Sequence, residues 1–230
     1  MVKTGKTTCY TYILAISVAR KKQVWETVFD SDLQFMALWR LRVYGLIVLF
    51  TALGNAFSPE TFADSMVREY NFYRNLHGVA SVKLNHSMSA DCDRYARALG
   101  SRSRVQPCLV HSRKNGENLM FYWNYASISE VELAEVTAKQ FYDELKFYNF
   151  DKPGFRFSAA HFTQMIWKGV KEIGVGVFER AFVKDSFGDC RVGTLAPAKA
   201  YFVVIHHSPE GNRFDGDEFL NNVFSAKRRL

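Results

Sequence analysis

The eight residues from His161 to Lys168 read HFTQMIWK. We predict a short helix over 157–167 that carries His161. Two strands are predicted after it, over 172–178 and 201–207, and the second is the clearer because YFVVI is β-branched and aromatic. The Gly and Pro residues between the strands indicate a turn, so the two strands are expected to form an antiparallel hairpin.

Helical spacing dominates the residues before this stretch. Ser58 is a predicted N-cap, and the helix that it starts is expected to end near 76–78, where a glycine supplies the stop. Further helices are predicted over 89–99 and 130–148, and a polar loop over 101–118. Because helices precede strands instead of alternating with them, the pattern favours an α+β fold over a doubly wound sheet.

Composition limits the class of protein. The chain has 230 residues, and 48% of them are hydrophobic, which suits one globular domain or at most two small ones. The formal net charge is +7, but more than half of the excess lies in residues 1–56, and no run of five or six basic residues occurs. We therefore expect no nucleic-acid partner.

The N-terminal leader has the pattern of a signal peptide. Residues 36–56 contain a basic start, an apolar stretch and a small-residue end, with cleavage predicted after Ala56. Residues 1–35 would then be a spurious extension before a start at Met36. The alternative is an uncleaved signal anchor that retains the protein at a membrane. The expected limits are a leader over 1–56, a domain over 57–223 and a basic tail over 224–230, and the expected location is extracellular.

The cysteines show no CxxC pair, which disfavours a zinc ribbon or a thioredoxin-type site. In an oxidising compartment we expect a disulfide between Cys92 and Cys108, which leaves Cys190 as the odd thiol. Asn85 begins a glycosylation sequon, Asn-His-Ser.

Five segments, in order, resemble the CAP superfamily of cysteine-rich secretory, antigen 5 and pathogenesis-related 1 proteins. They are YNFYRNLHGV at 70–79, GENL at 116–119, YDELKFY at 142–148, HFTQMIWK at 161–168 and PEGN at 209–212. The run over 148–155 is most similar to the Golgi-associated plant pathogenesis-related branch. The resemblance implies a three-layer α-β-α sandwich with a central antiparallel sheet.

The chain also departs from the family pattern. Ala160 replaces a Gly, Val170 replaces a Ser or Thr, and Ile205 stands where many secreted members carry Cys. His206 and His207 replace an Asn/Arg-Tyr pair. Because neighbouring side chains in a strand face opposite ways, these two histidines are not expected to share a metal ion, and we predict a solvated pair.

The resemblance carries over a cleft cluster of His111, Glu117, Glu144 and His161, all of which are present. His111 and His161 are candidate ligands for a divalent metal such as zinc, and the carboxylates could orient their rings. The other interpretation is that two His–Glu pairs satisfy each other and lock the loops to a helix.

These observations favour a non-enzymatic extracellular binding module, with no catalytic residue and no required cofactor. Its expected ligand is a lipid or sterol, a metal ion or a protein, and relatives of this kind can form homodimers. The alternative is a metal-dependent hydrolase with His111 and His161 as ligands and Glu117 as general base. Neither GxSxG nor HExxH occurs in the sequence.

Overall fold

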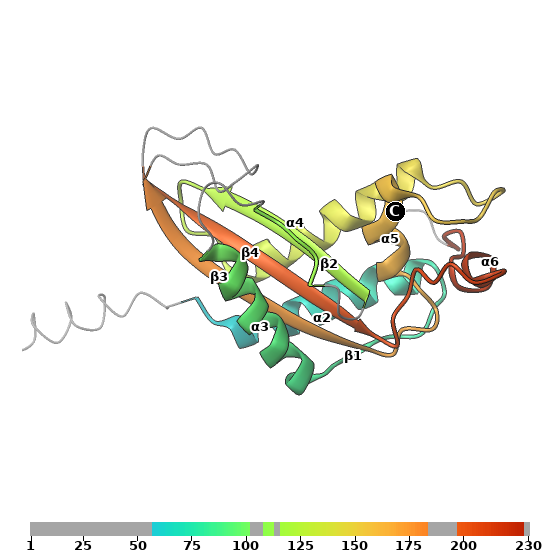
Figure 1. The fold of residues 1–230 in the computed structure, drawn as a ribbon, viewed down its shortest axis with the longest axis horizontal. Coiled ribbons are helices and arrows are strands. Elements are labelled where there is room, and N and C mark those ends of the chain that lie inside the picture. Colours follow the sequence, from blue (N-terminus) through green and yellow to red (C-terminus); the bar gives the residue numbers. More distant parts are fainter. Residues whose placement is uncertain (1–56, 102–107, 113–115, 184–196, 228–230) are drawn as a thin grey trace, which may run out of the picture. The chain divides into compact units, whose positions relative to one another are not determined.

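The computed structural model describes residues 57–101, 108–112, 116–183 and 197–227 (Figure 1). In chain order, its helices and strands are α2 (Pro59–Leu76), β1 (Lys83–Leu84), α3 (His86–Gly100), β2 (Gly116–Asn124), α4 (Glu130–Tyr142), the 3-10 helices η1 (Asp143–Phe147) and η2 (Phe157–Ala159), α5 (Ala160–Met165), β3 (Glu172–Val183), β4 (Pro197–Ser208) and α6 (Glu218–Asn222).

The strands form one sheet in the order β1-β3-β4-β2. The predicted hairpin is confirmed, because β3 and β4 pair antiparallel, and both strands are longer than expected. Strand β2 also pairs antiparallel with β4. Strand β1 runs parallel to β3 through Lys83 and Leu84 alone. The prediction of an antiparallel sheet therefore holds for the three long strands, and the short edge pair makes the sheet mixed.

Helices cover both faces of this sheet (Figure 1). Alternate residues of β4 point to different cores. Tyr201, Val203 and Ile205 join the core beneath α2, α4 and α5. Ala200, Phe202 and Val204 join a second core beneath α3. The domain is thus the predicted α+β sandwich, with α3 on one face of the sheet and α2 on the other.

Local signals explain where several helices begin and end. The Ser58 hydroxyl caps α2 by accepting from the Thr61 amide at 3.2 Å. Gly78 follows α2 at a φ of +66°, as its predicted stop requires. The third helix is shorter than predicted, because α4 gives way to the 3-10 turn η1 after Tyr142. The second begins earlier than predicted, because the Asn85 side chain accepts from the Met88 amide and caps α3.

Helix α3 lies directly against β3. A Cβ on Gly176 would come within 2.2 Å of the Cys92 backbone, so only glycine permits this approach. Two α3 side chains also accept from amides of β3: Ser89 Oγ from Val175 N and Asp93 Oδ1 from Val177 N, each at 3.0 Å. The glycines of β3 therefore serve helix packing.

A buried arginine joins α2 to the segment after α5. Arg74 is fully buried, and its guanidinium donates to the carbonyl oxygens of Ala80, Met165, Trp167 and Val170 at 2.8–3.0 Å. No carboxylate of the described residues pairs with it, so backbone carbonyls alone stabilise this charge. Burial lowers the pKa of Arg74 to about 10.

The start of the predicted basic tail contacts α2. The Lys227 amide donates to Leu76 O at 2.7 Å, and His77 Nδ1 bonds Phe224 O at 2.6 Å. The leader and most of the turn between β3 and β4 lie outside the described residues. Among the helices from Pro59 onward that the structure describes, none is both long and apolar enough to cross a bilayer.

Sequence reasoning missed strand β2, the two-residue strand β1 and the short helix α6. Strand β2 starts inside the stretch predicted as a loop over 101–118, and it carries Glu117. The short helix α6 follows β4. The first omission matters for function, because β2 forms one wall of the site described next.

Candidate functional site

All four residues of the predicted cleft cluster line one cavity of about 630 Å³ at the Gly116 end of β2. Glu117 comes from β2, Glu144 from η1 and His161 from α5, while His111 lies in the segment 108–112 that precedes β2. Four separate segments of the chain therefore meet at this cavity.

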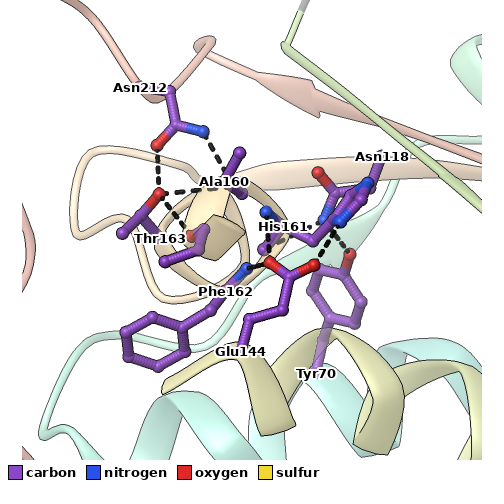
Figure 2. Close-up of polar contacts among 9 residues, drawn as sticks. Tyr70, Asn118, Glu144, Ala160, His161, Phe162, Thr163 and Asn212 are labelled. Carbon is purple, nitrogen blue, oxygen red and sulfur yellow. Dashed lines mark hydrogen bonds and ion pairs between the residues drawn. The ribbon is translucent and has the colours of Figure 1, made fainter. Parts of the chain in front are cut away.

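Glu144 makes three hydrogen bonds to the start of α5, two with His161 and one with Phe162 (Figure 2). Its Oε1 atom lies 2.7 Å from His161 Nδ1, and Oε2 accepts from the backbone amides of His161 at 2.9 Å and Phe162 at 3.2 Å. The His161 ring also stacks on Phe141, with ring centroids 4.8 Å apart. One carboxylate thus fixes both the first turn of α5 and the orientation of the imidazole.

Both carboxylate oxygens of Glu117 have hydrogen-bond partners, which come from three residues. Its Oε1 accepts from the Ser112 amide and lies 2.9 Å from His111 Nδ1, while Oε2 lies 2.9 Å from His206 Nε2. The Glu117 side chain is 3% exposed. Burial alone would raise its pKa, but the hydrogen bonds from His111, His206 and Ser112 outweigh burial and lower the pKa to about 2. This carboxylate is ionised at neutral pH.

The two carboxylates also set which ring nitrogens face the cavity. Each binds a histidine through Nδ1, which favours the tautomer with a proton on Nδ1 and a lone pair on Nε2. The side chains of His111 and His161 are 59% and 31% exposed. Neither Nε2 atom has a hydrogen-bond partner among the residues that the structure describes, so both are available to a ligand.

The prediction of a solvated pair at His206 and His207 is wrong. The two residues are 4% and 1% exposed, because the end of β4 is covered on both faces. They do face opposite ways: His206 binds Glu117, while the His207 ring lies 5.7 Å from Tyr70 and its Nδ1 bonds Gly116 O. Burial lowers the pKa of His207 to about 3, so its ring is neutral.

Other polar residues hold α5 in place and were not singled out from the sequence (Figure 2). Asn118 Nδ2 donates to His161 O at 3.1 Å. Asn212 accepts from the Thr163 hydroxyl at 2.6 Å and donates to Ala160 O at 2.8 Å. Asn212 belongs to the PEGN segment, so this motif of the sequence serves to fix the helix that carries His161.

The side chains of the cavity do not form a complete zinc site. Within the described part of the chain, no group of three or more His, Cys, Asp or Glu residues is arranged to hold a metal ion. A catalytic zinc takes three protein ligands, whereas two imidazoles are available here and both carboxylates are bound to them. This donor set does not fit a catalytic zinc ion.

The predicted disulfide between Cys92 and Cys108 is wrong. Cys92 is a free thiol, fully buried where α3 packs on the sheet, and its sulfur is hydrogen-bonded to the backbone of His206. Cys108 is in a disulfide whose partner lies outside the described residues. Glycosylation of Asn85 stays a prediction; its amide oxygen caps α3, and its amide nitrogen donates to Glu172 at 2.9 Å.

Two known proteins are similar to this chain in amino-acid sequence. Golgi-associated plant pathogenesis-related protein 1 of Homo sapiens is 32% identical over 172 residues, which cover 74% of this chain and 97% of that protein. Protein PRY2 of Saccharomyces cerevisiae is 34% identical over 118 residues, which cover 50% of this chain and 32% of that protein.

Among solved structures, the hookworm platelet inhibitor matches with a TM-score of 0.48 at 12% identity, covering 72% of this chain and 78% of that one. The family model described as CAP, cysteine-rich secretory protein family, matches residues 67–185, which include all four cleft residues. The chain therefore belongs to the CAP family.

Proposed function

We propose that this CAP-family protein is a secreted, non-enzymatic binding module whose ligand sits in the cavity around His111, Glu117, Glu144 and His161. The observation that carries the proposal is the bonding of Glu117. Both of its oxygens are bound by buried or backbone donors, so the residue acts as a structural anchor for His111 and β4.

The hydrolase alternative requires Glu117 to act as general base. A general base works best when its pKa lies near the working pH, and a pKa of about 2 makes Glu117 a very weak proton acceptor. Glu144 is similarly bound, to a ring nitrogen and two backbone amides. The cluster is thus better suited to hold two imidazoles in place than to move protons.

The size and lining of the cavity support a small amphipathic ligand such as a lipid or sterol. About 630 Å³ lies within the usual range for small-molecule sites, roughly 300–1,000 Å³. Three phenylalanines, Phe155, Phe157 and Phe214, line it together with the polar cluster. An apolar body could contact these rings while a polar group reaches the imidazoles.

Two observations support export. Residues 36–56 have the pattern of a signal peptide. Cys108 is disulfide-bonded, which is typical of proteins in oxidising compartments.

The test uses the full chain with its own leader, expressed in a secreting eukaryotic host. Native mass spectrometry of the secreted protein should show a co-purifying small molecule, and N-terminal sequencing should give a start at Phe57. Protein kept in membranes with an intact leader would contradict export.

Pools of esters and peptides are then screened for hydrolysis with the wild type and with His111→Ala/His161→Ala. The matched control is His86→Ala, which alters an exposed histidine on α3 outside the cavity. We expect no turnover by any of the three. Turnover that is lost in the double variant and kept in the control would overturn the non-enzymatic assignment.

A further inference from the structure

Three exposed phenylalanines stand at the mouth of the cavity. Phe155, Phe157 and Phe214 are 40%, 88% and 74% exposed, and all three line the cavity. The rings of Phe155 and Phe214 meet edge to face, with centroids 4.9 Å apart. A ligand that covers these rings would remove exposed aromatic surface from water, which is favourable. The mouth is therefore suited to an apolar body or to a cation held over aromatic faces.

The floor of the cavity is rich in hydrogen-bond acceptors and in negative charge. In their neutral form, His111 and His161 present Nε2 lone pairs as acceptors, because the carboxylates favour the proton on Nδ1. Glu117 and Glu144 are the charged residues of the described lining, and no Lys or Arg side chain of the described residues joins them there. A ligand group that meets the two Nε2 atoms would donate hydrogen bonds to them, and a positive charge on it would be favoured by the carboxylates.

A buried polar residue with an unpartnered atom also belongs to the lining of the cavity. Gln164 is 2% exposed and lines the cavity, and its amide nitrogen has no hydrogen-bond partner in the described residues. This carboxamide lies against the backbones of Gly116 and Gly211, where an added Cβ would come within 3.0 Å of it. Because an amide nitrogen donates, it does not bind an ammonium group, and a ligand atom that reached it would have to be an acceptor.

Resting on the proposed binding function, we infer that the cavity selects amphipathic amines, with the ammonium group at the imidazole and carboxylate floor and the apolar body between Phe155, Phe157 and Phe214. The ammonium group supplies three donors to the Nε2 atoms and to neighbouring oxygens. Aromatic rings at the mouth add both apolar contact and cation–π attraction.

The test compares three probes that differ only in the head group: 4-phenylbutylamine, 4-phenylbutan-1-ol and 4-phenylbutanoate. Binding to the full secreted chain is measured by titration calorimetry at pH 7.5. We expect the amine to bind at least about tenfold more tightly than the alcohol, and the carboxylate to bind most weakly.

Phe157→Ala and Phe214→Ala locate the binding. Both side chains are exposed, so their loss should leave the fold intact, and each should weaken the amine about fivefold. Phe72→Ala, which alters an exposed ring on α2 outside the cavity, should leave the affinity unchanged.

The outcomes separate two failures. If the alcohol or the carboxylate binds as tightly as the amine and Phe157→Ala weakens it, the cavity is a binding site but the amine inference is wrong. If the amine binds equally well to both cavity variants, or if no probe binds at any soluble concentration, the inference is also overturned. The hydrolysis screen tests the non-enzymatic function independently.

Discussion

Glu117→Gln is the most direct test of the hydrogen-bond network, because it removes the charge and keeps the shape. The pKa of Glu117 falls from 4.5 to about 2 in the folded protein. Each pKa unit corresponds to about 1.4 kcal/mol, so ionised Glu117 contributes about 3 kcal/mol to the free energy of unfolding. Since the side chain is almost completely buried, solvent screening reduces this figure little.

The sign of the pH dependence follows from the lowered pKa. The stabilisation is complete above the unfolded value of 4.5 and is lost as the pH falls through the folded value of about 2. We expect wild type to exceed Glu117→Gln by about 3 kcal/mol at pH 6, by about half of that near pH 3.3, and by less than about 0.5 kcal/mol at pH 2.

Equilibrium urea unfolding, followed by circular dichroism with the disulfide intact, measures this difference from pH 2 to pH 7. Glu210→Gln is the control, since it removes an exposed carboxyl group outside the cavity. A difference below about 1 kcal/mol at pH 6, or one that does not change with pH, would refute the reasoning that hydrogen bonds hold Glu117 ionised.

Three further predictions concern the core. Arg74→Met leaves four carbonyl oxygens without their guanidinium donor. It should therefore lower the free energy of unfolding in urea by about 3 kcal/mol or more, and an unchanged midpoint would contradict this. Gly176→Ala should cost about 2 kcal/mol by overpacking α3 on β3, whereas Gly154→Ala, whose Cβ meets nothing within 4 Å, should be neutral in thermal melts. Burial raises the pKa of Cys92 to about 12, so iodoacetamide at pH 8 should modify this thiol in urea and not in the folded protein, where rapid labelling would disprove its burial.

Much of the fold could be predicted because its signals are local. The cap at Ser58 and the stop at Gly78 each depend on one residue, and the pairing of β3 with β4 follows from two β-rich runs joined by a turn. Strand β2 gave no such signal. Its central residues are apolar without alternation, since Leu119 joins the core beneath α3 and Met120 the core beneath α2. A strand covered on both faces lacks the two-residue period that identifies a half-buried one.

The site was predictable only as far as the family resemblance reached. It indicated His111, Glu117, Glu144 and His161, and all four lie on one cavity. It did not indicate His206, because this residue meets Glu117 through the pairing of β2 with β4, in which the two residues are direct partners. Cys92 was misjudged for a similar reason, since its place beneath the sheet depends on how α3 packs.

The two hydrogen bonds between α3 side chains and β3 amides have a consequence for association between molecules. Ser89 and Asp93 bond amides of Val175 and Val177, which lie beyond the two residues paired with β1. A strand from another molecule that approached here would find these donors already engaged. It could add to the sheet along this stretch only after α3 had separated from β3, which would expose the core that contains Cys92. Resistance to intermolecular β-pairing at this border is thus coupled to the stability of the domain itself.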